Sequence, residues 1–176
     1  MNRDEQFVRI KQYFANKDKE LARRGKLPLG STEKGFWGTA HLDDCYEFFK
    51  QIQLDQEDNF LDLGSGDGRV VFVAALFTKA TGIEFDAPLH AQALAAQDVL
   101  QISGASFLCA DYSVLDLSAY AVWFSYADHN FSWLIPKQQE LRKLYLYHDT
   151  YHPDFLDKGK ITWIGQIPIF VYTRKE

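Results

Sequence analysis

The stretch NFLDLGSGDGRVVFVAALF, residues 59–77, constrains the fold more than any other part of the chain. It begins with the short apolar run NFLDL, which is typical of a buried strand. Three glycines follow at Gly64, Gly66 and Gly68, and the apolar run 69–77 has the composition of a helix. A strand, a glycine turn and a helix in this order predict one βα unit of an α/β sheet.

The same alternation continues along the chain. We expect helices at 42–53, 88–102 and 131–142 and strands at 80–85, 105–110, 120–125 and 144–150. Short strands separated by helices imply right-handed βαβ units and a parallel sheet. Residues 160–175 predict two strands joined by a tight turn at Gly165 and Gln166, with Pro168 at the start of the second strand. The predicted fold class is α/β: a doubly wound three-layer sandwich with a mostly parallel sheet of about seven strands and a C-terminal antiparallel hairpin.

The residues before this core predict a helix and an ordered loop. Between residues 3 and 24, apolar side chains recur at roughly helical spacing among many charges: Phe7, Ile10, Phe14 and Leu21. Gly25 is a suitable helix stop, and 26–41 is rich in glycine, serine, threonine and proline. With no repeat in view, 1–176 is expected to form one domain, in which 1–40 supplies the helix and loop and 41–176 the core.

Composition narrows the class of partner and compartment. The chain has 19 lysines and arginines against 24 aspartates and glutamates, a net charge of -5, so it offers no broad basic surface for nucleic acid. Cys45 and Cys109 have no second cysteine or histidine at ligand spacing, which argues against zinc and against a disulfide framework. The charged amino terminus does not resemble a signal peptide, and the longest apolar run is too short for a membrane span. We therefore expect a cytoplasmic protein with no metal.

The acids around the glycine turn indicate which ligand it takes. The spacing fails the dinucleotide fingerprint, because Arg69 stands where the third glycine belongs, and no P-loop motif is present. Asp62 and Asp67 would repel a pyrophosphate at short range. Glu84 and Asp111 end the next two strands, at the edge where open α/β sheets bind ligands. These acids favour a nucleoside that carries positive charge, and S-adenosylmethionine (SAM), with its ammonium and sulfonium, is such a nucleoside.

The pattern D-x-G-x-G-x-G after one strand, an acid after the next and an aspartate after the third resembles a class I SAM-dependent methyltransferase with a Rossmann-like fold. The resemblance implies that Gly64, Gly66 and Gly68 admit the methionyl moiety and that Asp62 lies near its ammonium. It further implies that Glu84 holds the ribose, that Phe85 packs on the adenine and that Asp111 and the Tyr112 backbone read the adenine edge. Ser65 and Asp67, within the turn, complete the predicted cofactor site.

The loop before the core resembles a particular subfamily. Thr39 lies 23 residues before Asp62, and FWGTA is similar to the short loop of small non-SET protein lysine methyltransferases, although it lacks their usual proline. That subfamily closes this loop over the methionyl end. The resemblance therefore makes Thr39 a cofactor contact and Trp37 a contact near the substrate, while plugging of the core by the aromatic side chain remains an alternative.

The acceptor is expected to meet the chain after the strand at 120–125. This segment has no N-P-P-[YFW] and no P-C, which argues against amide, adenine and cytosine C5 methylation. It offers Tyr126, Asp128 and His129 as catalytic candidates and Ser125 as a substrate contact, with aromatic neighbours: Trp123, Phe124, Phe131 and Trp133. An aromatic slot with a carboxylate suits an amine, and His129 could act as a base. Helix capping by Asp128 or Asn130 is the plain alternative, and His148 with Asp149 is a second candidate pair.

These inferences predict methyl transfer to an amine, with a protein lysine favoured as acceptor. The alternatives are a small-molecule O- or N-methyltransferase and a catalytically inactive SAM-binding module, and a nicotinamide-dependent reductase survives only if the turn tolerates its missing glycine. We expect a protein or small-molecule methyl acceptor as partner, and neither nucleic acid nor a membrane.

Overall fold

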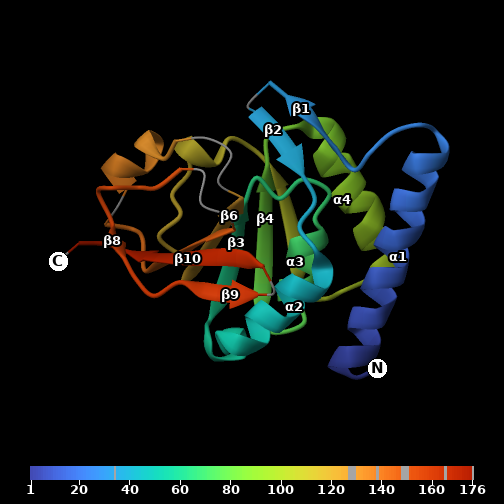
Figure 1. Cartoon of the computed structure of the whole chain (residues 1–176), viewed down its shortest axis with the longest axis horizontal. Coiled ribbons are helices and arrows are strands. Elements are labelled where there is room, and N and C mark those ends of the chain that lie inside the picture. The colour runs from blue at the N-terminus through green and yellow to red at the C-terminus, as the bar shows by residue number, and fades with distance from the viewer. Residues whose placement is uncertain (34, 127–129, 138, 148–150, 165, 176) are drawn as a thin grey trace.

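The fold is taken from a computed structural model, which describes residues 1–176 except 34, 127–129, 138, 148–150, 165 and 176. In the part of the chain it describes, the main sheet has eight strands in the order β5-β4-β3-β6-β7-β10-β8, with β9 paired to β10 (Figure 1). Their bounds are β3 Asn59–Leu63, β4 Lys79–Glu84, β5 Ala105–Cys109, β6 Val122–Tyr126, β7 Lys143–Tyr147, β8 Asp157–Lys158, β9 Thr162–Ile164 and β10 Ile167–Thr173. Strands β5, β4, β3, β6 and β7 run parallel, and β10 is antiparallel to β7, so the predicted α/β architecture is confirmed.

One face of the sheet is covered by α-helices: α1 Arg3–Arg23, α2 Leu42–Gln51, α3 Arg69–Ala74 and α4 Ala87–Leu100 (Figure 1). Phe7, Ile10 and Phe14 of α1 are buried as predicted, and Leu21 is only partly buried. Asn2 and Glu5 form a capping box at the start of α1. Gly25, at φ +70°, ends the helix, since its N–H donates to the carbonyl of Ala22 and that of Lys26 to the carbonyl of Leu21.

The other face is covered by irregular segments and short 3₁₀ turns, η2 Tyr112–Val114 and η3 Ser132–Lys137, packed around the fully buried Trp123. The expected α-helix at 131–142 is therefore wrong. Pro136 lies inside η3, and its missing N–H and fixed φ do not allow a continuous α-helix there. A further 3₁₀ turn, η1 Leu54–Gln56, precedes β3 on the helical face.

The loop expected at 26–41 contains a small antiparallel hairpin, β1 Leu29–Thr32 and β2 Gly35–Gly38, separate from the main sheet. The C-terminal hairpin forms as predicted: Ile164 pairs with Ile167, and Pro168 is the second residue of β10. Gly165, one of its two expected turn residues, lies outside the described residues. None of the described helices is both long and apolar enough to cross a membrane.

Candidate functional site

A cavity of about 300 Å³ opens at the carboxyl ends of β3, β4 and β6. The sequence-predicted residues that line it are Trp37, Thr39, Asp62, Gly64, Ser65, Gly66, Asp67, Glu84, Phe85, Asp111, Tyr112 and Tyr126. These come from the small hairpin and from the ends of the central parallel strands, which is where open α/β sheets bind ligands. The structure thus brings the predicted cofactor residues other than Gly68 to one pocket.

The glycine turn uses its glycines in two ways. Gly64 and Gly66 have φ values of +79° and +55°, and a Cβ at either position would meet nothing within 4 Å. These two glycines therefore leave open space on the pocket side of the turn. Gly68, at φ +81°, differs, since a Cβ there would lie 2.6 Å from the ring of Phe107. Gly68 packs against β5 and does not line the pocket, so the expectation that it admits the methionyl moiety is wrong.

Glu84, at the end of β4, fixes the turn to the next strand. Its carboxylate accepts hydrogen bonds from the N–H of Gly66 at 2.8 Å and the N–H of Asp86 at 2.7 Å. The N–H groups of Gly64 and Ser65 both donate to the carbonyl of Ile83. Each oxygen of the Glu84 carboxylate retains acceptor capacity after these bonds, so a ligand with two adjacent hydroxyls can still bind it.

Asp62 is buried, with 4% of its surface exposed, and none of the described residues donates a hydrogen bond or ion pair to its carboxylate. Burial raises the pKa of Asp62 to about 8, and the negative charges of Glu84 and Asp67 add to this effect. The nearby Cys45 thiol of α2 has a raised pKa as well, because it is buried and faces the Asp62 charge. An unpaired buried carboxylate of this kind is suited to a cationic ligand.

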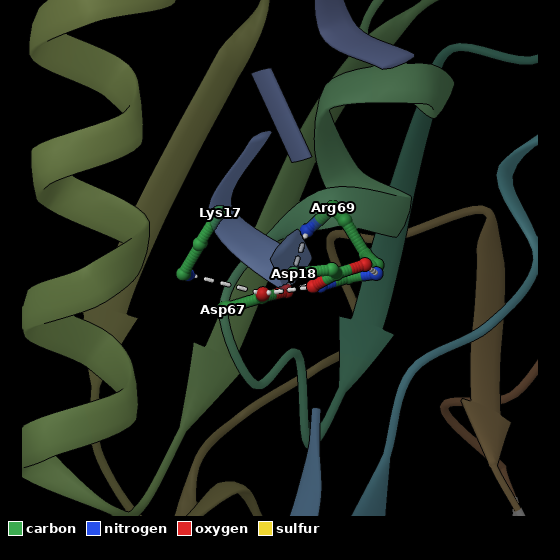
Figure 2. Close-up of polar contacts among 4 residues, drawn as sticks. All are labelled: Lys17, Asp18, Asp67 and Arg69. Carbon is green, nitrogen blue, oxygen red and sulfur yellow. Dashed lines mark hydrogen bonds and ion pairs between the residues drawn. The ribbon is translucent and has the colours of Figure 1, made fainter. Parts of the chain in front are cut away.

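Asp67 is equally buried but fully partnered (Figure 2). Its carboxylate accepts from the Arg69 guanidinium at 2.9 and 3.1 Å and from Lys17 of α1 at 3.1 Å. Arg69 in turn binds both oxygens of Asp18, at 2.9 and 3.1 Å. Burial alone would raise the pKa of Asp67, but the Arg69 hydrogen bonds and the charges of Arg69 and Lys17 hold it below its ordinary value. Asp67 lines the pocket, yet its charge is neutralised within the protein.

Part of the cavity lining is aromatic. Phe85 is 40% exposed at the pocket and Leu89 is buried beside it. Asp111 is the N-cap of η2, and its carboxylate accepts hydrogen bonds from the N–H and the hydroxyl of Ser113. The ring of Tyr112 lies 5.0 Å from that of Trp133. An exposed ring beside polar groups at a strand end can stack on a planar base.

Of the residues expected to meet the acceptor, one lines the pocket, one does not, and the others are not described. Tyr126, the last residue of β6, lines the pocket with its ring 5.7 Å from Tyr147. Ser125 is buried outside the lining, and its hydroxyl donates to the carbonyl of Leu63 at 3.2 Å, which does not favour contact with a substrate. Asp128 and His129, and the pair His148 and Asp149, lie outside the described residues.

Sequence reasoning missed some residues of this site. Thr32 of β1 and Arg69 line the pocket, and the buried Trp133 indole N–H there has no hydrogen-bond partner among the described residues. Arg69 could have been found from the sequence. An arginine at the first position of a helix is unfavourable unless a nearby acid pairs with it, and Asp67 lies two residues before it. The sequence carried no such signal for Lys17 and Asp18, which are about 50 residues away.

Comparisons with known proteins relate this fold to methyltransferases. The family model of the histone methylation protein DOT1 matches residues 31–105. An RNA methyltransferase from Salinibacter ruber in complex with S-adenosyl-L-homocysteine has a TM-score of 0.65 at 18% identity, over 78% of this chain and 95% of that one. A SAM-dependent methyltransferase from Aquifex aeolicus gives 0.56 at 13%, over 73% and 88%. A mutant of MtNAS in complex with S-adenosylmethionine gives 0.61 at 10%, over 76% and 63%. No curated protein sequence matches the chain significantly.

The chain therefore has the fold of the SAM-dependent methyltransferases, and fold and family match together indicate a methyltransferase with SAM as its cofactor. The pocket residues fit this cofactor on two observations of the structure. Asp62 is buried without a partner in the described part of the chain, as a binding group for an ammonium would be, and Gly64 and Gly66 leave a cradle that a Cβ would fill. Among the described residues, no cluster of histidine, cysteine, aspartate and glutamate could hold a metal ion.

Proposed function

We propose that this protein transfers a methyl group from SAM to an amine, and that the favoured acceptor is a protein lysine side chain. The observation that carries the proposal is the buried Asp62, to which no described residue donates, beside the open Gly64–Gly66 turn. A dinucleotide would bring phosphates against this carboxylate, whereas SAM brings an ammonium and a sulfonium.

In the proposed complex, Asp62 pairs with the ammonium of SAM, and Gly64, Ser65 and Gly66 admit its methionyl chain. Glu84 accepts hydrogen bonds from the ribose hydroxyls through its remaining lone pairs. Phe85 packs on the adenine, and Asp111 and the Tyr112 backbone read the adenine edge. Thr39 and Trp37 close the pocket from the amino-terminal side, which the cavity lining supports.

When bound, SAM supplies a methyl group that its sulfonium has already activated. The chain then has to exclude water, align the amine with the methyl carbon and accept the proton that the amine loses. Tyr126 lines the pocket at the end of β6 and is the proposed alignment residue on the acceptor side. Asp128 and His129, which follow it in the sequence, remain the proposed carboxylate and base.

The choice of a protein lysine rests on two observations. The match to a histone methylation family covers the turn and all but the first two residues of the hairpin beside the pocket. Among the described residues, the pocket lining comes mainly from the small hairpin, the ends of the parallel strands and the turns that follow them, which suits a protruding side chain better than a fully enclosed metabolite. A small-molecule O- or N-acceptor and an inactive SAM-binding module are the competing outcomes of the test.

The experiment starts with calorimetry of the pure protein with SAM, S-adenosylhomocysteine and NAD. We expect binding of the first two, and binding of NAD alone would overturn the proposal. Label from [methyl-³H]SAM is then followed in a cell lysate, where protein-bound label supports a protein acceptor. Label only in the low-mass fraction would identify a small-molecule acceptor, and tight SAM binding without transfer would identify a binding module.

The Glu84→Ala variant should lose SAM binding, with Ser125→Ala as the matched control for a buried polar residue outside the pocket lining.

A further inference from the structure

Helix α1 supplies none of the residues that line the pocket, yet it binds the turn that does. Lys17 donates to Asp67 at 3.1 Å, and Asp18 accepts two hydrogen bonds from Arg69 (Figure 2). Asp67 and Arg69 bind each other as well. The four side chains form one charge network between α1 and the glycine turn.

The position of Arg69 points to a role for this network beyond holding α3. Arg69 is the first residue of α3, after its N-cap Gly68. A positive charge there faces the positive end of the helix dipole, which costs stability. Arg69 is nevertheless 5% exposed, and its guanidinium lies over the ring of Phe14 at 4.8 Å. The carboxylates of Asp67 and Asp18 must therefore hold this cation in place.

The network acts on the part of the turn that faces the ligand. Asp67 follows Gly66, whose N–H binds Glu84, and it precedes Gly68, whose N–H donates to the Ser65 carbonyl. A fixed Asp67 therefore fixes the backbone from Gly66 to Gly68, at the helix end of the open cradle. The network also neutralises Asp67, so that Asp62 is the turn's carboxylate without a partner among the described residues.

We propose that α1 is a positioning element of the cofactor site, in which Lys17 and Asp18 hold the Asp67–Arg69 pair, shape the glycine turn for SAM and set the charge around Asp62. This inference rests on the proposed function for the identity of the ligand. Lys17 and Asp18 are positioning residues, because they act on the ligand through Asp67 and Arg69. Helix α1 also lies outside the residues that the family model matches, so the family match does not account for it.

The chain offers a matched control on the same helix. Lys11 forms an ion pair with Asp43 of α2, so it also ties α1 to the body, but it does not touch the turn. The variants to compare are Lys17→Gln, Asp18→Asn and Lys11→Gln, with Lys17→Arg as the conservative rescue. For each, calorimetry gives the Kd for SAM and S-adenosylhomocysteine and the pH dependence of SAM binding. Hydrogen exchange of the amides at 64–68 is measured on the ligand-free protein.

We expect Lys17→Gln and Asp18→Asn to weaken binding of both ligands about three- to tenfold and to speed exchange at 64–68, while Lys11→Gln and Lys17→Arg match the wild type. The acid limb of the SAM binding profile should move to higher pH in Lys17→Gln, because Asp67, whose charge acts on Asp62, loses a cation that offsets it. It should move to lower pH in Asp18→Asn, because the network loses an anion. Loss of structure alone would not move the two limbs in opposite directions.

Equal effects of Lys17→Gln and Lys11→Gln on exchange and on affinity would overturn the inference, as would shifts of the same sign in Lys17→Gln and Asp18→Asn. Failure of the wild-type protein to bind SAM would overturn the proposed function instead. In that case the exchange of 64–68 in the ligand-free variants still decides whether α1 holds the turn.

Discussion

The two sides of the glycine turn each carry a buried aspartate, and the two aspartates are used in opposite ways. On the helix side, Asp67 has Arg69 and Lys17 as partners, and its pKa lies below the ordinary value. On the strand side, Asp62 has no donor among the described residues, and its pKa is raised to about 8. Burial is the same at 3% and 4% exposure, so the set of partners decides what each acid does.

The two sides of the turn therefore contribute to the free energy of folding with opposite signs. A buried ion pair with good geometry holds its surroundings, whereas a buried carboxylate without a donor is destabilising while it is charged. The turn therefore combines a paired acid that fixes its shape with an unpaired acid whose cost a cationic ligand would remove. A destabilising buried charge of this kind is expected where a protein binds its ligand.

The largest expected effect comes from removing the paired acid. Asp67→Asn leaves the buried Arg69 with Asp18 as its remaining partner in the network and leaves Lys17 unpaired, so we expect the free energy of unfolding to fall by about 3–5 kcal/mol. Because the pKa of Asp67 is depressed in the folded state, its stabilising contribution is present above pH 4 and is lost as the pH falls further. Urea unfolding at pH 7 and at pH 3 measures both effects. Equal stability of variant and wild type at pH 7 would mean that the network does not hold the turn.

Removing the unpaired acid should have the opposite effect on stability. Asp62→Asn removes a buried charge without breaking a bond to a described residue, so we expect the protein to become about 1–3 kcal/mol more stable at pH 8. SAM binding should weaken about 100-fold, since the ammonium loses its partner. Calorimetry measures the expected loss of SAM affinity, and urea unfolding of the same sample measures the expected gain in stability. A destabilised variant with unchanged SAM affinity would contradict both the assignment and the comparison.

The raised pKa of Asp62 predicts a proton release on cofactor binding. At pH 7 the free carboxyl is mostly protonated, and an ammonium binds its ionised form, so SAM affinity should rise about tenfold between pH 6 and pH 7. The rise ends near pH 8, where an α-amino group loses its own proton. Without ligand, the raised pKa stabilises the fold below pH 4 relative to pH 8, and this contribution is lost as the pH rises between them. Calorimetry in two buffers of different ionisation enthalpy counts the proton, which Asp62→Asn should not release.

Most of the pocket could be predicted from the sequence, because it depends on local order along the chain. The strand NFLDL is found at the predicted residues, and acids that end parallel strands must meet at one edge of the sheet. The separate roles of Asp62 and Asp67 could not be predicted, since they depend on Lys17 and Asp18 of α1. Pairing across about 50 residues leaves no periodic signal, and both acids look equally available in the motif.

The second face of the sheet was less predictable for a different reason. The apolar residues of 131–142 occur at a spacing that helices and buried turns share, and Pro136 decides in favour of a 3₁₀ turn. The small hairpin at 29–38 has the sequence pattern of a loop, because its strands are short and rich in glycine. In both places weak local preferences are overruled by what the segment packs against.

The smallest expected effect concerns two neighbouring residues at the end of β6. Like the two aspartates, one of them is bonded within the protein and the other faces the pocket. Ser125 uses its hydroxyl within the protein, on the carbonyl of Leu63, while Tyr126 lines the pocket. Ser125→Ala should cost about 1 kcal/mol of stability and leave methyl transfer unchanged. Tyr126→Phe should leave SAM affinity unchanged and lower kcat, because the proposed role of Tyr126 is to align the acceptor and not the cofactor. Single-turnover transfer from labelled SAM, with urea unfolding of both variants, checks the pair. A loss of transfer in Ser125→Ala at unchanged stability would place the acceptor on the other side of β6.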